Sequence, residues 1–325
     1  MKPKKEEMAM TDYTTMTLHT AEPEYEKHFW NGIRGDMHCW DKLWMGRNTL
    51  PGAYALPAAS QKKFRMELEK ESLFRRIGIT LQAYRNGSRI FTTDGEKLSQ
   101  WVAEGGDIPV YDGIEDFTRY PVESHKLVAM FRMDEDFIRD VSFDVESYLI
   151  KRLARNFGKA EENAFINGSG TSMPTGILAE KNGADTVTVN GDLKFDAIHQ
   201  LYFSVKPEYR LKGYWLMNDE TSLYLRNLKD DRENYLWRGA ADNLLGRPVI
   251  ISQFMPSVES GIKPIVFIDF SYYWIIPRDT VRIQALKEKF AAFNQVGYLA
   301  YEFLDGKLIR PEAVKAIQIV AKNEE

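Results

Sequence analysis

The sequence predicts an α+β fold in which a long hairpin projects from a body of helices and strands. Three observations support this prediction. A long amphipathic helix is expected near the middle of the 325-residue chain, short apolar runs alternate with helical segments after it, and a polar stretch separates two strand-like runs before it. A chain of this length holds one large domain or two smaller ones, with ample material for a buried core.

The composition is that of a globular protein with a slightly acidic balance. Hydrophobic residues make up 44% of the chain and charged residues 28%, which argues against overall disorder. The formal net charge of −4 is spread along the chain and argues against a basic face that grips nucleic acid. The single Cys39 excludes an intrachain disulfide, and the sequence shows neither a signal-peptide h-region nor a membrane-length apolar run. We therefore expect a soluble intracellular product with no membrane association.

The N-terminal part is expected to be an arm followed by helical segments. Residues 1–24 are polar and lack periodicity, which predicts a mobile arm. Aromatic residues recur between 24 and 44, where a short helix and a turn are expected. A stretch punctuated by proline and glycine, 49–59, then leads into a helix over 59–74.

Two strand-like runs, around 77–91 and 122–133, flank a polar excursion that carries several glycines. Long loops inside a compact domain are uncommon, and most of them are functional or projecting elements. The sequence therefore predicts a long hairpin that reaches away from the body.

The clearest helix is expected over about 142–167. Ser142 can cap it, and Asp144 and Glu146 stand in its first turn, where the helix dipole favours negative charge. Gly168 is a normal C-terminal stop, and the helix is roughly 35 Å long at 1.5 Å per residue. Its apolar stripe consists of Val145, Leu149, Leu153, Phe157, Ala160 and Ala164.

The remainder of the chain alternates helix and strand. Helices are expected at 195–204 and at 219–228, the second capped by Asp219. Strands or strand-like segments are expected at 214–218, 248–252, 265–270, 273–277, 281–285, 295–303 and 313–320.

The glycine-rich loop "INGSGTSMPTGIL" raises the question of chemistry. A phosphate-binding P-loop follows a strand and ends in Gly-Lys-Ser/Thr, whereas this loop follows a helix and no lysine comes after Gly176. A nucleophile elbow needs Gly-x-Ser-x-Gly between strand and helix, and Ser169 stands directly after Gly168. The loop, with Gly168, Gly170, Pro174 and Gly176 as its signature residues, is therefore interpreted as a shaped connection.

Other candidates for chemistry are weaker. His28, His38 and Cys39 lack the spacing of a metal site, and the acidic run Asp134-Glu135-Asp136 is better explained as a solvated helix start. The five histidines do not assemble a Ser/His/Asp set by local spacing. We therefore expect no catalytic residue, no cofactor and no metal ion.

The motifs in their order resemble the major capsid proteins of tailed bacteriophages, the Hong Kong 97-type fold family. The central string is "RLARNFGKAEENAFINGSGTSMPTGIL", a long helix followed by Gly-Ser-Gly and Pro-x-Gly. Upstream strings similar to the family are "EYEKHFWNGIRG", "PGAYALP", "ESLFRRIG", "QWVAEGGDIP" and "VESHKLVAMFRMDEDFIRD". Downstream strings are "YWLMNDETSLYLRNLKD", "LLGRPVIISQFMP" and "LDGKLIRPEAVKAIQIV", so the resemblance spans about 25–320.

The resemblance implies an architecture for each part of the chain. It implies an N-terminal arm, a peripheral domain with a long spine helix and a β-sheet, an extended hairpin loop and an axial domain. The implied boundaries are 1–58 for the arm; 59–84, 122–194 and 276–325 for the peripheral domain; 85–121 for the hairpin; and 195–275 for the axial domain.

The resemblance also implies a function and partners. Such proteins assemble through hexamers and pentamers into an icosahedral head around double-stranded DNA, which they contact non-specifically. The implied partners are further copies of the chain, a portal protein and scaffolding or protease proteins, and the implied location is the virion after synthesis in the bacterial cytoplasm. The hairpin, with Trp101, Glu104 and Gly105, is implied to overlap a neighbouring subunit.

Two alternatives remain open from the sequence. An encapsulin-type compartment shell has the same fold, and a soluble nucleotide-binding enzyme would use the Gly168–Gly176 loop. Two departures from the family also stand out. About 25 residues precede the first matching segment, so scaffolding is expected to be brief or supplied separately. Some relatives cross-link a hairpin lysine to a distant asparagine with the help of a glutamate. Lys97, Asn294 and Glu302 are the corresponding candidates here, but the sequence around them matches poorly, which argues against self-cross-linking.

Overall fold

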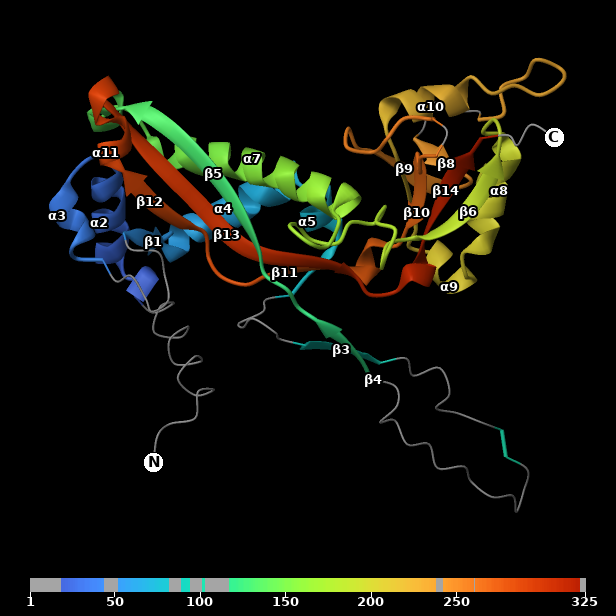
Figure 1. Cartoon of the computed structure of the whole chain (residues 1–325), viewed down its shortest axis with the longest axis horizontal. Coiled ribbons are helices and arrows are strands. Elements are labelled where there is room, and N and C mark those ends of the chain that lie inside the picture. Colours follow the sequence, from blue (N-terminus) through green and yellow to red (C-terminus); the bar gives the residue numbers. More distant parts are fainter. Residues whose placement is uncertain are drawn as a thin grey trace.

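Two sheets and one long helix organise the chain (Figure 1). The computed structural model describes residues 19–43, 52–81, 89–93, 101–102, 117–237, 242–259 and 261–321. Helix α7 (Val145–Asn167) runs beside the first sheet and leads towards the second. The mixture of helices and strands confirms the predicted α+β class.

The first sheet is built around β13 (Gln295–Leu308), a strand of 14 residues. It pairs antiparallel with β12 and β11 along one edge and with β5 along the other. The strand order is β1-β12-β13-β11-β2, and β5 lies beside β13 on its other edge. The other strands of this sheet are β1 (Ala53–Ala55), β12 (Arg282–Leu286), β11 (Tyr273–Pro277), β2 (Ile79–Thr80) and β5 (His125–Asp134).

Helices cover one face of this sheet and form a core with it. Alternate residues of β13 point to this core, among them Tyr298 and Ala300, as the twofold period of a strand requires. The helices on this side are α2 (Pro23–Ile33), α3 (Met37–Trp40), α4 (Ala58–Glu71), α5 (Leu73–Ile77), α6 (Glu135–Arg139) and α7; α11 (Lys287–Phe290) packs at the end of β13. The predicted apolar stripe of α7 supplies Val145, Leu149, Leu153 and Phe157 to the core. Its last two members were predicted wrongly, because Ala160 is exposed and Ala164 half-buried, and the buried side of the helix continues through Glu161 and Phe165.

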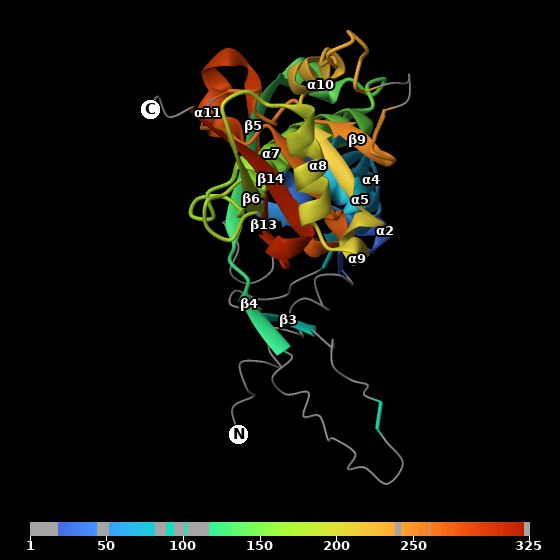
Figure 2. The same ribbon diagram turned by 90° about the vertical axis from the view of Figure 1, so that its right-hand side faces the viewer.

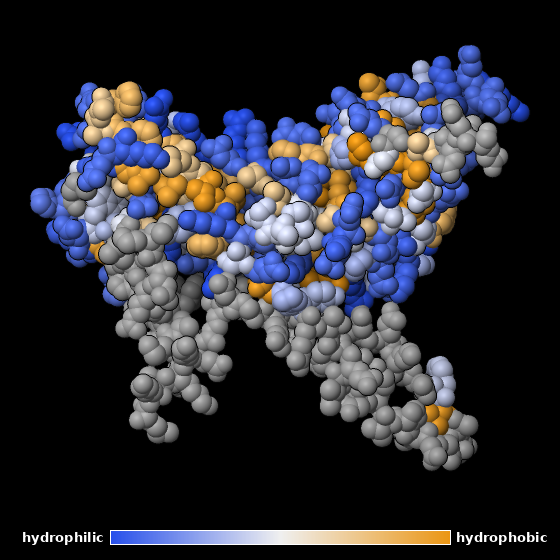
Figure 3. Space-filling model, viewed as in Figure 1, coloured by the Kyte–Doolittle hydropathy of each residue, from blue (hydrophilic) through white to orange (hydrophobic). Residues whose placement is uncertain are grey.

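The opposite face of β5 is partly apolar and exposed. Val128 is 44% and Met130 49% exposed, and hydrophobic residues gather along β5 and β13 in the view of Figure 3. Among the described residues β5 pairs with β13 alone, so its outer edge is open. Exposed apolar side chains on an open edge strand are typical of a surface that another chain covers.

Helix α7 begins later than the sequence predicts. Its N-cap is Asp144, whose Oδ1 accepts the Ser147 N–H at 3.1 Å, so the helix starts at Val145. Ser142, the predicted cap, instead donates its hydroxyl to Asp140 Oδ1 at 2.7 Å in the preceding turn. The prediction of Ser142 as cap was therefore wrong, because Asp140 competes for its hydroxyl.

The second sheet has the order β6-β14-β10-β7-β9-β8. Its strands are β6 (Asp185–Asn190), β14 (Val314–Val320), β10 (Ile265–Ile268), β7 (Tyr214–Met217), β9 (Arg247–Ile251) and β8 (Asn243–Leu244). The nearby helices are α8 (Phe195–Ser204), α9 (Pro207–Arg210) and α10 (Asp219–Arg226). The cap of α10 is Asn218, which accepts the Thr221 N–H at 2.7 Å, and not the predicted Asp219.

Two segments that the resemblance assigns to the peripheral domain, 122–194 and 276–325, each supply a strand to the second sheet. These strands are β6 and β14, which pair with each other, and β14 also pairs with β10. Helices α2 and α3 were expected within an arm, but Phe29 and Ile33 are fully buried in the core beneath α7. Large apolar side chains at helical spacing explain why α2 packs against the body.

Strands β3 (Arg89–Thr93) and β4 (Phe117–Pro121) form an antiparallel ladder that projects from the body (Figure 2). In Figure 1 the ladder lies below the point where β11 and β13 meet, and in both ribbon views it lies on the side of the body away from α7. Thr93 pairs with Phe117 at its far end, so residues 94–116 connect the two strands. No helix within the described part of the chain is long and apolar enough to cross a membrane.

Candidate functional site

The glycine-rich loop folds back on the last turn of α7. The N–H of Gly176 donates to Gly168 O at 2.9 Å, and the next two amides, of Ile177 and Leu178, donate to Phe165 O and Ile166 O at 2.8 and 2.9 Å. The exit of the loop therefore pairs with carbonyls at the helix end that have no partner within the helix. In a phosphate-binding loop the backbone amides point at the ligand. Here these amides are already used in hydrogen bonds to backbone carbonyls.

Two glycines make this close approach possible. A Cβ on Gly168 would lie 1.9 Å from Pro174 O and 2.3 Å from Ala164 O. A Cβ on Gly176 would lie 2.5 Å from both Gly168 N and Ile166 O. Because backbone atoms cannot move aside as a flexible side chain can, only glycine fits at either position.

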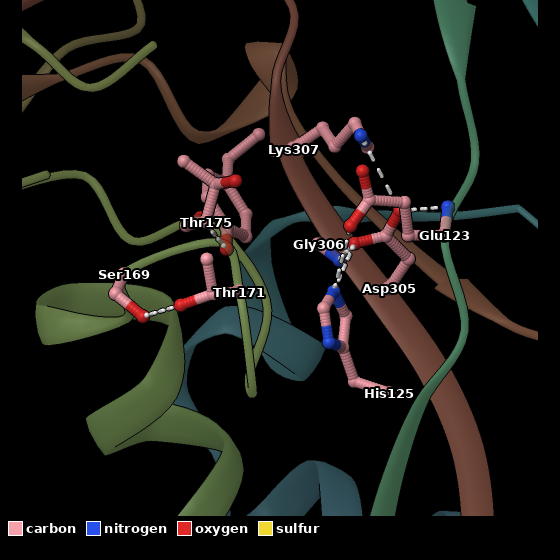
Figure 4. Close-up of polar contacts among 9 residues, drawn as sticks. Glu123, His125, Ser169, Thr171, Thr175, Asp305, Gly306 and Lys307 are labelled. Carbon is pink, nitrogen blue, oxygen red and sulfur yellow. Dashed lines mark hydrogen bonds and ion pairs between the residues drawn. The ribbon is translucent and has the colours of Figure 1, made fainter. Parts of the chain in front are cut away.

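Two hydroxyls of the loop, those of Ser169 and Thr171, bond to each other. Ser169 Oγ lies 2.8 Å from Thr171 Oγ1 (Figure 4), and Tyr273 Oη donates to Thr175 O at 2.8 Å. A nucleophilic serine needs a general base within hydrogen-bond reach. The geometry gives Ser169 a hydroxyl partner, which agrees with the interpretation of the loop as a connection.

Next to the loop, the carboxylate of Asp305 binds the segment that returns from the hairpin (Figure 4). Its Oδ2 accepts the Glu123 N–H at 2.7 Å, and its Oδ1 accepts the Gly306 N–H at 2.8 Å. His125 Nε2 and Lys307 Nζ each lie 3.6 Å from the carboxylate. Burial raises the pKa of Asp305, and its hydrogen bonds and Lys307 oppose that rise. One buried carboxylate thus fixes the chain between β4 and β5 to β13.

We expect Asp305→Ala to loosen this attachment. Removing the carboxylate takes away the acceptor of the part-buried Glu123 N–H, and a hydrogen bond to a charged group contributes about 1.5–3 kcal/mol. Hydrogen exchange at the Glu123 amide should accelerate by roughly tenfold or more, while exchange in β14 stays unchanged. Unaltered protection at Glu123 would contradict the assigned role of Asp305.

A second buried polar cluster joins α7 to the sheet and to α5. Arg75 donates through Nη2 and Nε to the two carboxylate oxygens of Glu161, at 2.7 and 2.9 Å, in a bidentate pair. The side chain of Glu302 on β13 is buried beside them, and its Oε1 has no hydrogen-bond partner among the described residues. Burial, and then the negative charge of Glu161, raise the pKa of Glu302 well above its usual value, although Arg75 opposes the shift.

This cluster predicts a pH-dependent stability. Because folding raises the pKa of Glu302, the folded state holds a proton that the unfolded state releases above about pH 4.5. Stability should therefore fall as pH rises from that value towards the raised pKa, by up to about 1.4 kcal/mol per pH unit. Glu302→Gln, which stays neutral, should flatten this part of the profile in urea unfolding measured between pH 5 and 8. If the profile of the Glu302→Gln chain runs parallel to that of the parent chain, the assignment is refuted.

The residues singled out from the sequence do not converge on one site. Gly168, Gly170, Pro174 and Gly176 lie together at the end of α7, with Gly170 at φ +79°. Trp101 is fully exposed, at 105% of its reference area, whereas Glu104 and Gly105 lie outside the described residues. Cys39 is buried and donates its thiol to Asp36 Oδ2 at 3.2 Å. Within the described ranges no group of three or more His, Cys, Asp or Glu side chains is arranged to hold a metal ion.

Comparison with known proteins places this architecture in a family. The family model described as "Phage capsid family" matches residues 52–319, which include most of both sheets, α7, the glycine-rich loop and the β3–β4 ladder. The chain belongs to the phage capsid family. This confirms the resemblance drawn from the ordered motifs of the sequence.

Individual phage capsid relatives agree with this assignment. The chain is 24% identical over 210 residues to "Probable major capsid protein gp17" of Mycobacterium phage L5, covering 65% of this chain and 62% of that protein. It is 23% identical over 224 residues to the protein of the same name in Mycobacterium phage D29, covering 66% and 64%. The matched region therefore spans less than two thirds of either relative.

Solved capsid structures share the fold over a larger part of their length. The capsid of a native GTA particle superposes with a TM-score of 0.63 at 26% identity, covering 76% of this chain and 90% of that one. The capsid of the empty GTA particle gives a TM-score of 0.61, also at 26% identity, covering 77% and 90%. A chain of Gordonia phage Cozz, at 12% identity, shares the fold with a TM-score of 0.57, covering 78% and 87%.

Proposed function

We propose that this chain is a major capsid protein that assembles with further copies of itself into the shell of a phage head. The family membership carries the proposal, because its model spans both sheets and the helix between them. The protein would then act by forming contacts between subunits and would have no catalytic turnover. Its location would be the virion, after synthesis in the bacterial cytoplasm.

Two features of the isolated subunit support an assembled state. The β3–β4 ladder projects away from the body, and Trp101 beyond it is fully exposed. Large aromatic side chains and open strand edges favour contact with another chain in water. The exposed Val128 and Met130 on β5 offer a second surface of this kind.

The fold suggests a role for each part of the subunit. The segment 85–121, including Trp101, Glu104 and Gly105, would overlap a neighbouring subunit. The second sheet would meet its copies at the centres of hexamers and pentamers, and the glycine-rich loop would connect α7 to it. One related capsid was determined with C5 symmetry, which agrees with five-fold centres in that particle.

Further partners follow from the same proposal. A closed head that is filled with DNA needs a portal, and its assembly needs scaffolding or protease proteins. Contact with the enclosed double-stranded DNA would be non-specific, in keeping with the net charge of −4. An encapsulin shell is the less favoured alternative, because the family match and the similar proteins described above are phage or GTA capsids.

Sedimentation of the purified chain tests the proposal. The 37.6 kDa protein should form species of about five and six times its own mass, or larger shells. Saturable binding of ATP by a chain that remains a monomer at all concentrations would instead favour the nucleotide-binding enzyme. The two functions thus predict different masses and different ligands.

A further inference from the structure

Helix α7 carries a cluster of exposed basic residues on one side. Lys151, Arg155 and Lys159 follow one another at intervals of four residues, and Arg152 lies beside them on the same face. All four side chains are exposed, and we call this set the basic stripe. It extends for about 12 Å along the helix. The surface over α7 is correspondingly hydrophilic in Figure 3.

The basic stripe has no acidic partner within the described part of its own chain. None of the four cations lies within 4 Å of a described carboxylate, and the guanidinium of Arg152 bonds to the hydroxyl of Tyr148. Glu146 pairs with Lys63 at 2.7 Å. Glu162 accepts the Ser252 hydroxyl at 2.6 Å, so it too is already engaged. Four positive charges on two and a half turns of helix are thus left for another partner.

The connection between β3 and β4 has the complementary charge. Residues 94–116 contain seven carboxylates and a single basic residue, Lys97, for a formal net charge of −6. The whole chain has a net charge of only −4, so this segment is more acidic than the rest of the protein taken together. Its carboxylates are Asp94, Glu96, Glu104, Asp107, Asp112, Glu115 and Asp116.

We propose that the acidic segment 94–116 of one subunit docks on the basic stripe of a second copy. The inference rests on the proposed function, because it names the surface that receives the projecting hairpin. Charge complementarity selects the segment 94–116 as the partner of the basic stripe and fixes the register of the contact. A positively charged surface attracts a negatively charged segment and repels a positively charged one. The contact lies between two copies, because the β3–β4 ladder leads away from α7 of its own chain in both ribbon views.

Charge reversal on either side tests the docking. The stripe variant is Lys151→Glu, Arg155→Glu and Lys159→Glu, and the segment variant is Asp112→Lys, Glu115→Lys and Asp116→Lys. Each variant should fold with an unchanged melting profile and should reduce the fraction of protein in capsomers by on the order of tenfold or more at low salt. A matched control, Lys62→Glu, Lys181→Glu and Lys212→Glu, makes the same change in net charge on scattered exposed lysines and should assemble normally.

Mixing the two variants distinguishes docking between copies from docking within one chain. In a ring where the two variants alternate, the lysines in the segment of one variant meet the glutamates on the stripe of the other. The unchanged acidic segment of the stripe variant then meets the unchanged basic stripe of the segment variant. The equimolar mixture should therefore recover the capsomer fraction that each variant alone loses, whereas contact within one chain predicts no recovery on mixing. Recovery should also occur when both sets of changes are combined in one chain, and parental assembly should weaken as salt shortens the range of the attraction.

Three results would overturn the inference. The stripe variant could assemble like the parent, the mixture could fail to recover assembly, or the stripe variant could close normal heads that lose only their contact with DNA. The last result would make the basic stripe a DNA-facing surface. Failure of the parent chain to form capsomers would instead count against the proposed function, so the two failures are distinguishable.

Discussion

Replacing residues 94–116 by the dipeptide Asn-Gly is expected to abolish the assembly of capsomers and shells while leaving the subunit folded. Thr93 and Phe117 form the last pair of the β3–β4 ladder, and a two-residue Asn-Gly turn closes such a ladder without strain. The replaced segment includes the fully exposed Trp101, so little buried surface should be lost from the body. Sedimentation velocity should show only monomer, and thermal unfolding should match that of the parent.

A linker of equal length separates the effect of sequence from that of length. A glycine- and serine-rich segment of 23 residues in place of 94–116 should also fail to assemble, because it carries neither the carboxylates nor Trp101. Closed heads of normal size from either variant would show that the hairpin has no role between subunits.

Gly168→Ala is expected to destabilise the subunit by roughly 3 kcal/mol or more. The new Cβ would stand 1.9 Å from Pro174 O, and relief of that contact would break the pairing of the loop with the end of α7. Gly176→Ala should behave in the same way, since its Cβ would meet the backbone of Gly168 and Ile166 at 2.5 Å. Urea unfolding of dissociated subunits would measure both changes.

Ser172→Ala provides the matched control in the same loop. Ser172 is exposed, and its replacement should change the free energy of unfolding by less than about 0.5 kcal/mol. A Gly168→Ala chain as stable as the Ser172→Ala chain would mean that the loop can open without loss, contrary to its geometry.

The elements with a strong local pattern could be predicted from the sequence. Helix α8 was expected at 195–204 and occupies Phe195–Ser204, and α7 ends before Gly168 as expected. The strands around β10 and β11 were found because short apolar runs there are bounded by turn residues. The α+β class follows from these elements together.

Long-range pairing could not be read from local patterns. The local pattern of 314–320 predicts an apolar strand but does not say which sheet it joins. In the structure β14 pairs with β10 on one side and β6 on the other, so it belongs to the second sheet. The N-cap of α7 depended on Asp140, which binds the hydroxyl of Ser142 and leaves capping to Asp144. Such competition between neighbouring polar groups becomes visible only in three dimensions.

The buried polar residues were missed for a similar reason, although a signal was present. Glu161 lies four residues from both Phe157 and Phe165 on the buried side of α7, so a carboxylate interrupts an apolar face. Glu302 likewise alternates with Ala300 and Leu304 on the inner side of β13. A carboxylate at a core position predicts a buried partner, but the identification of Arg75 required the fold.

Electron microscopy of the overexpressed, purified chain tests the central claim most directly. We expect closed shells of uniform diameter, or hexamers and pentamers that close into shells when concentrated, with the β3–β4 hairpin of each subunit lying on its neighbour. A chain that stays a monodisperse monomer at every concentration and salt condition, with or without its scaffolding partner, would contradict the assignment of a shell-forming function.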